Sequence, residues 1–147
     1  MNKNNINFQV HRTKEGTICE IVSGLLVLIS LIISLLMLAR NPEGAAAMLI
    51  QTVTIGFAIA LILILVYHPT NFNIPDDSPA EMFVATIRFC RYVSVLMALM
   101  SLGTTLSEFI GFNPAPVMAG FGILFVPLLC WYLHLYIKVK KDASSDR

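Results

Sequence analysis

The feature that most constrains the fold is an apolar run over residues 21–39, which contains no charged side chain. A bilayer core about 30 Å thick is crossed by roughly twenty such residues in helical form. The run is too long for the core of a signal peptide, and no small-residue cleavage site follows it. We therefore expect residues 18–39 to form a retained transmembrane helix.

Three further apolar segments have the same character, and we expect them to span the membrane over residues 45–67, 89–109 and 117–137. The first two spans are joined by residues 40–44. In this segment Asn41 is a favoured helix N-cap and Pro42 suits the first helical position, where a missing N–H costs nothing. The spacing predicts a tight helical hairpin. A second short turn is expected over residues 111–116, which contain Gly111, Asn113 and two prolines.

The only substantial connection falls between the second and third spans. Residues 70–77 contain one proline, two asparagines and two aspartates, residue types that all favour turns. They are followed by Ser78-Pro79-Ala80-Glu81, a capping-box pattern in which Ser78 and Glu81 satisfy each other's backbone N–H groups. The third helix is therefore predicted to begin at Ser78 or Pro79 and to project beyond the membrane before entering it near Phe89.

The composition supports an integral membrane protein of one domain. Hydrophobic residues make up 56% of the chain and charged residues 13%, about half the charged fraction of an average soluble protein. A net charge of +1 with basic residues flanking apolar segments gives no nucleic-acid site. We expect an all-α bundle of four membrane helices over residues 18–141, with polar tails at 1–17 and 142–147 and the lipid bilayer as its surroundings.

Lysine and arginine near the span ends predict the orientation, because cytoplasmic loops retain positive charge. With the N-terminus inside, the outer side has only Arg40. The inner side then holds Lys3, Arg12, Lys14, Arg88, Arg91, Lys138, Lys140, Lys141 and Arg147. Both termini are therefore expected in the cytoplasm, with the two short turns outside and the longer loop inside.

Small residues four apart allow helices to approach closely in lipid. The sequence has several such pairs: Ser30 and Ser34, Gly56 and Ala60, Ser94 and Ala98, and the series Gly103, Ser107 and Gly111. They favour packing within the bundle, and a dimer face is the alternative.

Charged residues near the span ends are the candidate site residues, because charges at membrane depth need partners. We expect Arg40 and Glu108 to form a direct ion pair at the outer ends of the first and third spans. The alternative is a bond from Arg40 to Glu43 in its own turn. At the inner end Glu20 is expected to meet Arg88 or Arg91. Glu20 and Arg40 lie roughly 200° apart around a straight helix, so one face cannot serve both pairs.

A candidate polar cluster at the cytoplasmic end contains His68, Tyr92 and His134, together with other polar residues near the span ends. A specific metal site would need two ligands at close helical spacing, such as HxxxH, and no such pair occurs in the sequence. Cys19, Cys90 and Cys130 likewise show no CxxC spacing. Motifs of hydrolases, metalloproteases and phosphate-binding loops are missing from the sequence. We therefore predict no catalytic residue, metal or cofactor.

The connection after the second span, residues 67–75, has the order Pro, then Phe-Asn, then Pro, at Pro69, Phe72-Asn73 and Pro75. It precedes a third span that contains arginine. This pattern resembles an uncharacterised bacterial membrane domain found in immunity proteins of the sporulation-delay type. The family's other mark, a His-Phe-Asn segment after the first span, is replaced here by the turn at residues 40–44. The resemblance implies a bacterial origin, location in the cytoplasmic (inner) membrane and a small multi-pass scaffold without known catalysis.

The sequence favours a non-enzymatic membrane protein that acts by binding another membrane protein, as an accessory, immunity-like or regulatory subunit. The grounds are that no charged residue lies at the middle of any span and that small residues form faces on which helices can pack. The alternative is a small-solute or drug transporter that works as a homodimer. A midplane cavity with Thr, Ser or Gln side chains facing it would favour transport over binding.

Overall fold

The computed structural model describes residues 13–68 and 80–145, and these residues form four α-helices without strands. The helices are α1 (Lys14–Arg40), α2 (Pro42–Tyr67), α3 (Ala80–Ile110) and α4 (Ala115–Ser145). All four are long and apolar enough to cross a membrane. The all-helical class and the four candidate spans of the sequence analysis are therefore confirmed.

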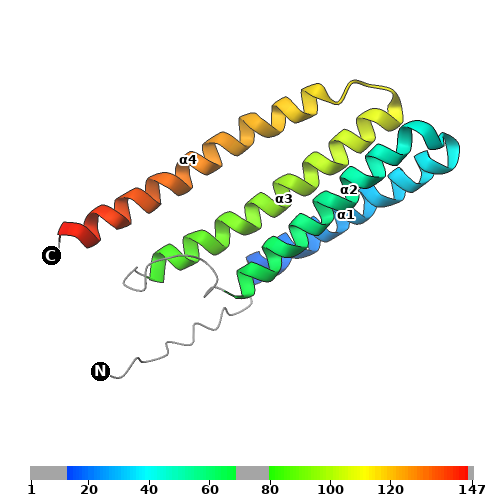
Figure 1. The fold of residues 1–147 in the computed structure, drawn as a ribbon. Helices are drawn as coiled ribbons and strands as arrows, with labels where there is room; N and C mark the ends of the chain where they lie inside the picture. The colour runs from blue at the N-terminus through cyan, green and yellow to red at the C-terminus, as the bar shows by residue number, and fades with distance from the viewer. Residues whose placement is uncertain (1–12, 69–79, 146–147) are drawn as a thin grey trace.

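The helices alternate in direction along the bundle (Figure 1). The start of α1, the end of α2, the start of α3 and the end of α4 thus lie at one end, which we call the polar end. The opposite end, the hairpin end, carries the α1–α2 and α3–α4 connections. Lys14, Arg88 and Lys138 belong to the polar end, whereas Arg40 lies at the hairpin end.

Three helices extend further at the polar end than the spans alone require. The N-terminal tail was expected to reach residue 17, but α1 already begins at Lys14 because Thr13 caps it, accepting a 3.1 Å hydrogen bond from the Gly16 N–H. A polar tail was expected over residues 142–147, and α4 continues into this segment as far as Ser145. Helix α3 starts at Ala80, well before Phe89, as expected. The loop at 70–77 and both side chains of the capping box, Ser78 and Glu81, lie outside what the structure describes.

The two turns at the hairpin end are short. A single residue, Asn41, separates α1 from α2, and it occupies the N-cap position, although its side chain makes no capping hydrogen bond. Helix α3 ends in a Schellman motif. Gly111 has a φ of +84°, and the N–H groups of Gly111 and Phe112 donate to the carbonyls of Glu108 and Ser107 at 3.0 and 2.7 Å. The left-handed backbone explains why glycine stands at position 111.

The interior is built largely from small and hydroxyl side chains. Helix α3 buries Ser94, Ala98, Ser101 and Thr105, whose spacing of four, three and four residues keeps them on one face. Helix α1 buries three serines, Ser23, Ser30 and Ser34. Such residues let helix backbones approach closely in an apolar environment. The serines at 30, 34 and 94 and Ala98 thus pack within the bundle, as expected, whereas Ala60 and Gly111 are exposed.

Most buried hydroxyls donate to a carbonyl of their own helix. The Ser30 hydroxyl donates to the Leu26 carbonyl at 2.9 Å, and the Thr105 hydroxyl to the Ser101 carbonyl at 2.8 Å. One buried bond joins two helices, between the hydroxyls of Ser34 on α1 and Thr52 on α2 at 3.1 Å. The hydroxyls therefore fill helix–helix contacts.

Helix α4 differs from the other three in its surroundings. Helices α1, α2 and α3 pack against one another, whereas α4 packs mainly on α3, on the side away from α1 and α2 (Figure 1). In the most apolar 18-residue stretch of α4 no residue is buried, whereas 28% of the residues in the corresponding stretch of α3 are buried. Its contacts with α3 include a stack of Tyr132 on Phe89, with ring centroids 4.5 Å apart. The bundle is thus a three-helix core with a peripheral fourth helix.

Candidate functional site

Side chains from three helices meet at the polar end and form what we call the polar cluster. Its members come from the first turns of α1, the last turn of α2 and the first half of α3. They are Thr13, Glu15, Glu20, Tyr67, Arg88, Arg91 and Tyr92.

Arg91 is the centre of the polar cluster. The residue is only 4% exposed. Arginine is almost never buried to this degree unless its charge is paired. Its Nη2 lies 3.5 Å from Glu20 Oε1, and its Nη1 donates to the Thr13 hydroxyl at 3.3 Å. The Tyr67 hydroxyl donates to the same Glu20 oxygen at 2.5 Å. One carboxylate therefore ties α1 to both α2 and α3.

Gly16 makes room for the guanidinium group of Arg91. A Cβ atom added at Gly16 would overlap the guanidinium carbon and both terminal nitrogens. The Nε atom of Arg91 is also buried, and it has no hydrogen-bond partner among the described residues. The guanidinium group is therefore packed tightly between helices, with its charge balanced by Glu20.

A second, more exposed set of contacts surrounds Glu15. Arg88 Nε lies 3.8 Å from Glu15 Oε2, and both side chains are about half exposed. The Tyr92 hydroxyl donates to Glu15 Oε1 at 2.6 Å. Exposed ion pairs contribute about 0–1 kcal/mol, so this pair adds little stability.

The sequence expectations for the polar end are met in part. Glu20 pairs with Arg91, one of its two expected partners. Of the residues expected as a cluster, Tyr92 bonds to Glu15, whereas His68 and His134 are exposed and no described hydrogen bond or ion pair connects them to Tyr92. Within the described ranges, no group of three or more His, Cys, Asp or Glu residues is placed to hold a metal ion.

Thr13, Glu15 and Gly16 were missed because α1 was expected to begin at residue 18. The available signal was Thr13 as a helix N-cap with an acidic residue, Glu15, in the first turn behind it. The role of Gly16 had no sequence signal, because it depends on which residue of α3 lies opposite.

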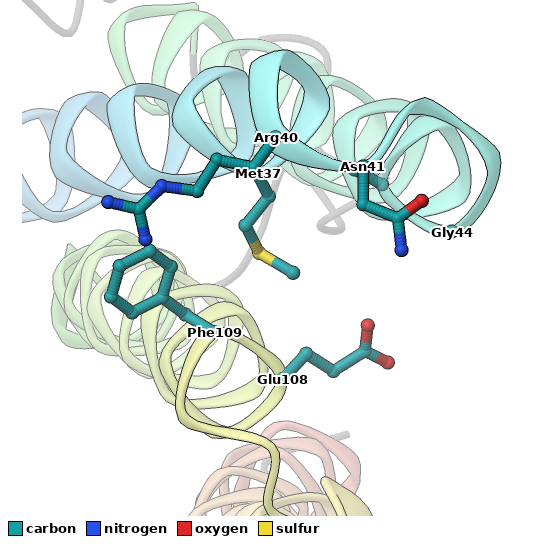
Figure 2. A pocket seen from close by; sticks show the side chains of 7 residues that line it. Met37, Arg40, Asn41, Gly44, Glu108 and Phe109 are labelled. Carbon is teal, nitrogen blue, oxygen red and sulfur yellow. The ribbon is translucent and has the colours of Figure 1, made fainter.

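The hairpin end contains a pocket of about 300 Å³, which we call the hairpin pocket (Figure 2). It lies between the α1–α2 turn and the last turns of α3. The lining residues are Met37, Arg40, Asn41, Gly44, Ala45, Glu108 and Phe109.

The expected ion pair between Arg40 and Glu108 is not formed. Both residues line the hairpin pocket, but the salt bridges among the described residues are those of Arg88 and Arg91 only. The guanidinium carbon of Arg40 instead lies 5.7 Å from the centroid of the Phe109 ring (Figure 2). A cation–π contact at an exposed site is worth about 0.5–1 kcal/mol, as much as an exposed ion pair. The side chain of Glu43, the alternative partner, lies outside the described residues.

Comparisons with protein-family models, with curated proteins and with solved structures gave no match. The resemblance to the immunity-protein domain therefore stays a prediction from the sequence.

Proposed function

We propose that this chain is a multi-pass protein of a bacterial cytoplasmic membrane, with both termini inside, that acts without catalysis by binding another membrane protein. The orientation is supported by the charge distribution, since Arg40 is the single basic residue at the hairpin end among the described residues, whereas Lys14, Arg88 and Lys138 lie at the polar end. Cytoplasmic retention of positive charge then places the polar end inside.

The placement of α4 carries the proposal of partner binding. This helix packs mainly on α3 and leaves its other faces uncovered. Its outward face repeats apolar residues at intervals of four and three, the spacing by which helices interlock. This outward face consists of Ala119, Ile123, Val126, Cys130, Leu133 and Ile137, all of them exposed. A transmembrane helix of another protein would pack along it.

The position of polar groups supports binding more than the transport alternative. Most buried serine and threonine hydroxyls bond to their own helix backbones, as with Ser30 and Thr105, and the buried Ser101 hydroxyl has no partner among the described residues. The hairpin pocket lies at one end of the helices. A transport pathway needs polar side chains facing a cavity near the bilayer midplane.

The proposed orientation predicts the accessibility of introduced cysteines in intact cells. A cysteine in place of Gly44, which lies in the first turn of α2 and where an added Cβ would meet no atom within 4 Å, should react with a membrane-impermeant maleimide. A cysteine in place of Asp146 should react only after the cells are permeabilised. The background should be a chain with all three native cysteines replaced by serine. The reverse labelling pattern would overturn the orientation.

Partner binding predicts that a gentle-detergent preparation contains a second protein in fixed stoichiometry, measured by intact-mass analysis. Replacing Ile123 and Val126 with alanine should reduce the bound partner about tenfold, because two buried apolar side chains are truncated. The matched control replaces Ile32 and Leu36 on the exposed face of α1 with alanine, and it should retain the partner. A clean homodimer would instead support the transport alternative, and equal loss from both variants would contradict a role for α4.

A further inference from the structure

The hairpin pocket presents two opposite charges that do not neutralise each other. Arg40 and Glu108 both line it, yet neither takes part in a salt bridge among the described residues. A pocket that holds an unpaired cation and an unpaired anion is complementary to a ligand carrying both charges.

The Glu108 side of the pocket suits an ammonium group. The Glu108 carboxylate and the Asn41 side chain lie on the same side of the pocket, with the Asn41 amide nitrogen turned toward Glu108 and the amide oxygen turned away from it (Figure 2). The Asn41 side chain is at a helix N-cap but makes no capping hydrogen bond, so its amide oxygen is available to a ligand. A primary ammonium donates three hydrogen bonds, and a carboxylate and an amide oxygen both accept.

The Arg40 side suits a phosphate. Its guanidinium group lies over the Phe109 ring, on the opposite side of the pocket from the Glu108 carboxylate (Figure 2). Guanidinium donors match phosphate oxygens in a bidentate geometry, and stacking on an aromatic ring leaves the edge of the group accessible. Met37, which also lines the pocket, supplies an apolar contact between the two charged sides.

The location of the pocket fits the headgroup layer of a bilayer. Helix α1 ends at Arg40 and α3 ends at Ile110, so the pocket lies where two apolar segments stop. Phe109 lines the pocket and is exposed, and so are Ile110 and Phe112, which follow it closely in the chain. Aromatic residues are enriched at this depth, beside the start of the acyl chains.

We propose that the hairpin pocket binds a phosphoethanolamine group, with the phosphate at Arg40 and the ammonium at Glu108 and Asn41. The inference rests on the membrane insertion in the proposed function, but not on partner binding. The same group occurs in phosphatidylethanolamine and in free phosphoethanolamine. A choline headgroup cannot donate N–H bonds, and a glycerol headgroup carries no cation for Glu108.

The test is native mass spectrometry of the detergent-solubilised full chain with dioleoyl phosphatidylethanolamine, phosphatidylcholine and phosphatidylglycerol at equal concentrations. The wild-type chain should retain phosphatidylethanolamine about tenfold better than the other two lipids. Glu108→Gln should remove this preference. Arg40→Gln should lower retention of all three lipids. Lys138→Gln, an exposed change at the polar end, should alter neither the preference for phosphatidylethanolamine nor the overall retention of lipid.

Arg40 and Glu108 are both exposed, so their variants should fold, and unchanged thermal unfolding of each variant checks this. Displacement of the lipid by an equal concentration of free phosphoethanolamine would assign the site to the soluble compound. Equal retention of phosphatidylethanolamine and phosphatidylglycerol by wild type and Glu108→Gln would overturn the inference. If a cysteine at position 44 is still labelled from outside intact cells, equal retention of the two lipids would overturn the lipid site alone and leave the proposed topology intact. Failed membrane insertion would instead change the labelling pattern.

Discussion

Replacing Glu20 with alanine is expected to destabilise the helix bundle by about 3–5 kcal/mol, because it leaves the Arg91 guanidinium buried without its counter-charge. Arg91 is 4% exposed, and Glu20 accepts from both Arg91 and Tyr67. Interhelical hydrogen bonds alone contribute about 0.6 kcal/mol on average in membrane proteins, so most of the loss comes from the unpaired charge. Denaturant-induced unfolding in detergent micelles measures the effect.

The control for Glu20 is the exposed pair at the same end. Arg88→Gln removes the salt bridge to Glu15 and should cost no more than about 1 kcal/mol. Adding Arg91→Met to Glu20→Ala should recover much of the stability, because an apolar side chain then fills the site. Losses of equal size from Glu20→Ala and Arg88→Gln would show that Arg91 does not depend on Glu20.

Replacing Gly16 with alanine is expected to cost about 1–3 kcal/mol, the usual range for overpacking. The added Cβ would occupy the space of the Arg91 guanidinium group. That group is the end of a flexible side chain and can move, but a shift would break its contacts with Thr13 and Glu20. The same unfolding measurement in micelles reports the loss.

The matched control for Gly16 is Gly24→Ala on the same helix. An added Cβ at Gly24 meets no atom within 4 Å, so alanine should be neutral or should stabilise the helix by up to about 1 kcal/mol. In an Arg91→Ala background, Gly16→Ala should likewise lose its cost, because the clashing group is gone. A stabilising Gly16→Ala in the wild-type background would contradict the tight packing of Arg91.

The helices were predictable because their signals are local. Uninterrupted apolar runs and the Asn41-Pro42 turn determine where α1 ends and α2 begins. Helix α1 begins at Lys14, but the sequence analysis placed its start at residue 18. The predicted start was too late because hydropathy marks the apolar part of a helix and not its polar first turn. Thr13 as N-cap was the better signal.

The contacts of the candidate site were less predictable because they depend on how helices rotate against one another. The pairing of Glu20 with arginine on α3 followed from matching depths at the span ends. Arg40 was expected to form an ion pair with the carboxylate of Glu108, but its guanidinium group lies over the ring of Phe109, the next residue of α3. The two contacts differ by less than about 1 kcal/mol, a difference too small for charge pairing to decide from sequence.

The most direct test of partner binding is photo-crosslinking in native membranes. A photoreactive residue is placed at Ile123 on α4 in one sample and at Ile32 on α1 in another; both side chains are at least half exposed. We expect position 123 to give an adduct with one other membrane protein of defined mass, and position 32 to give lipid adducts alone. Lipid adducts alone from both positions, or an adduct with the mass of two copies of the chain, would contradict the proposal.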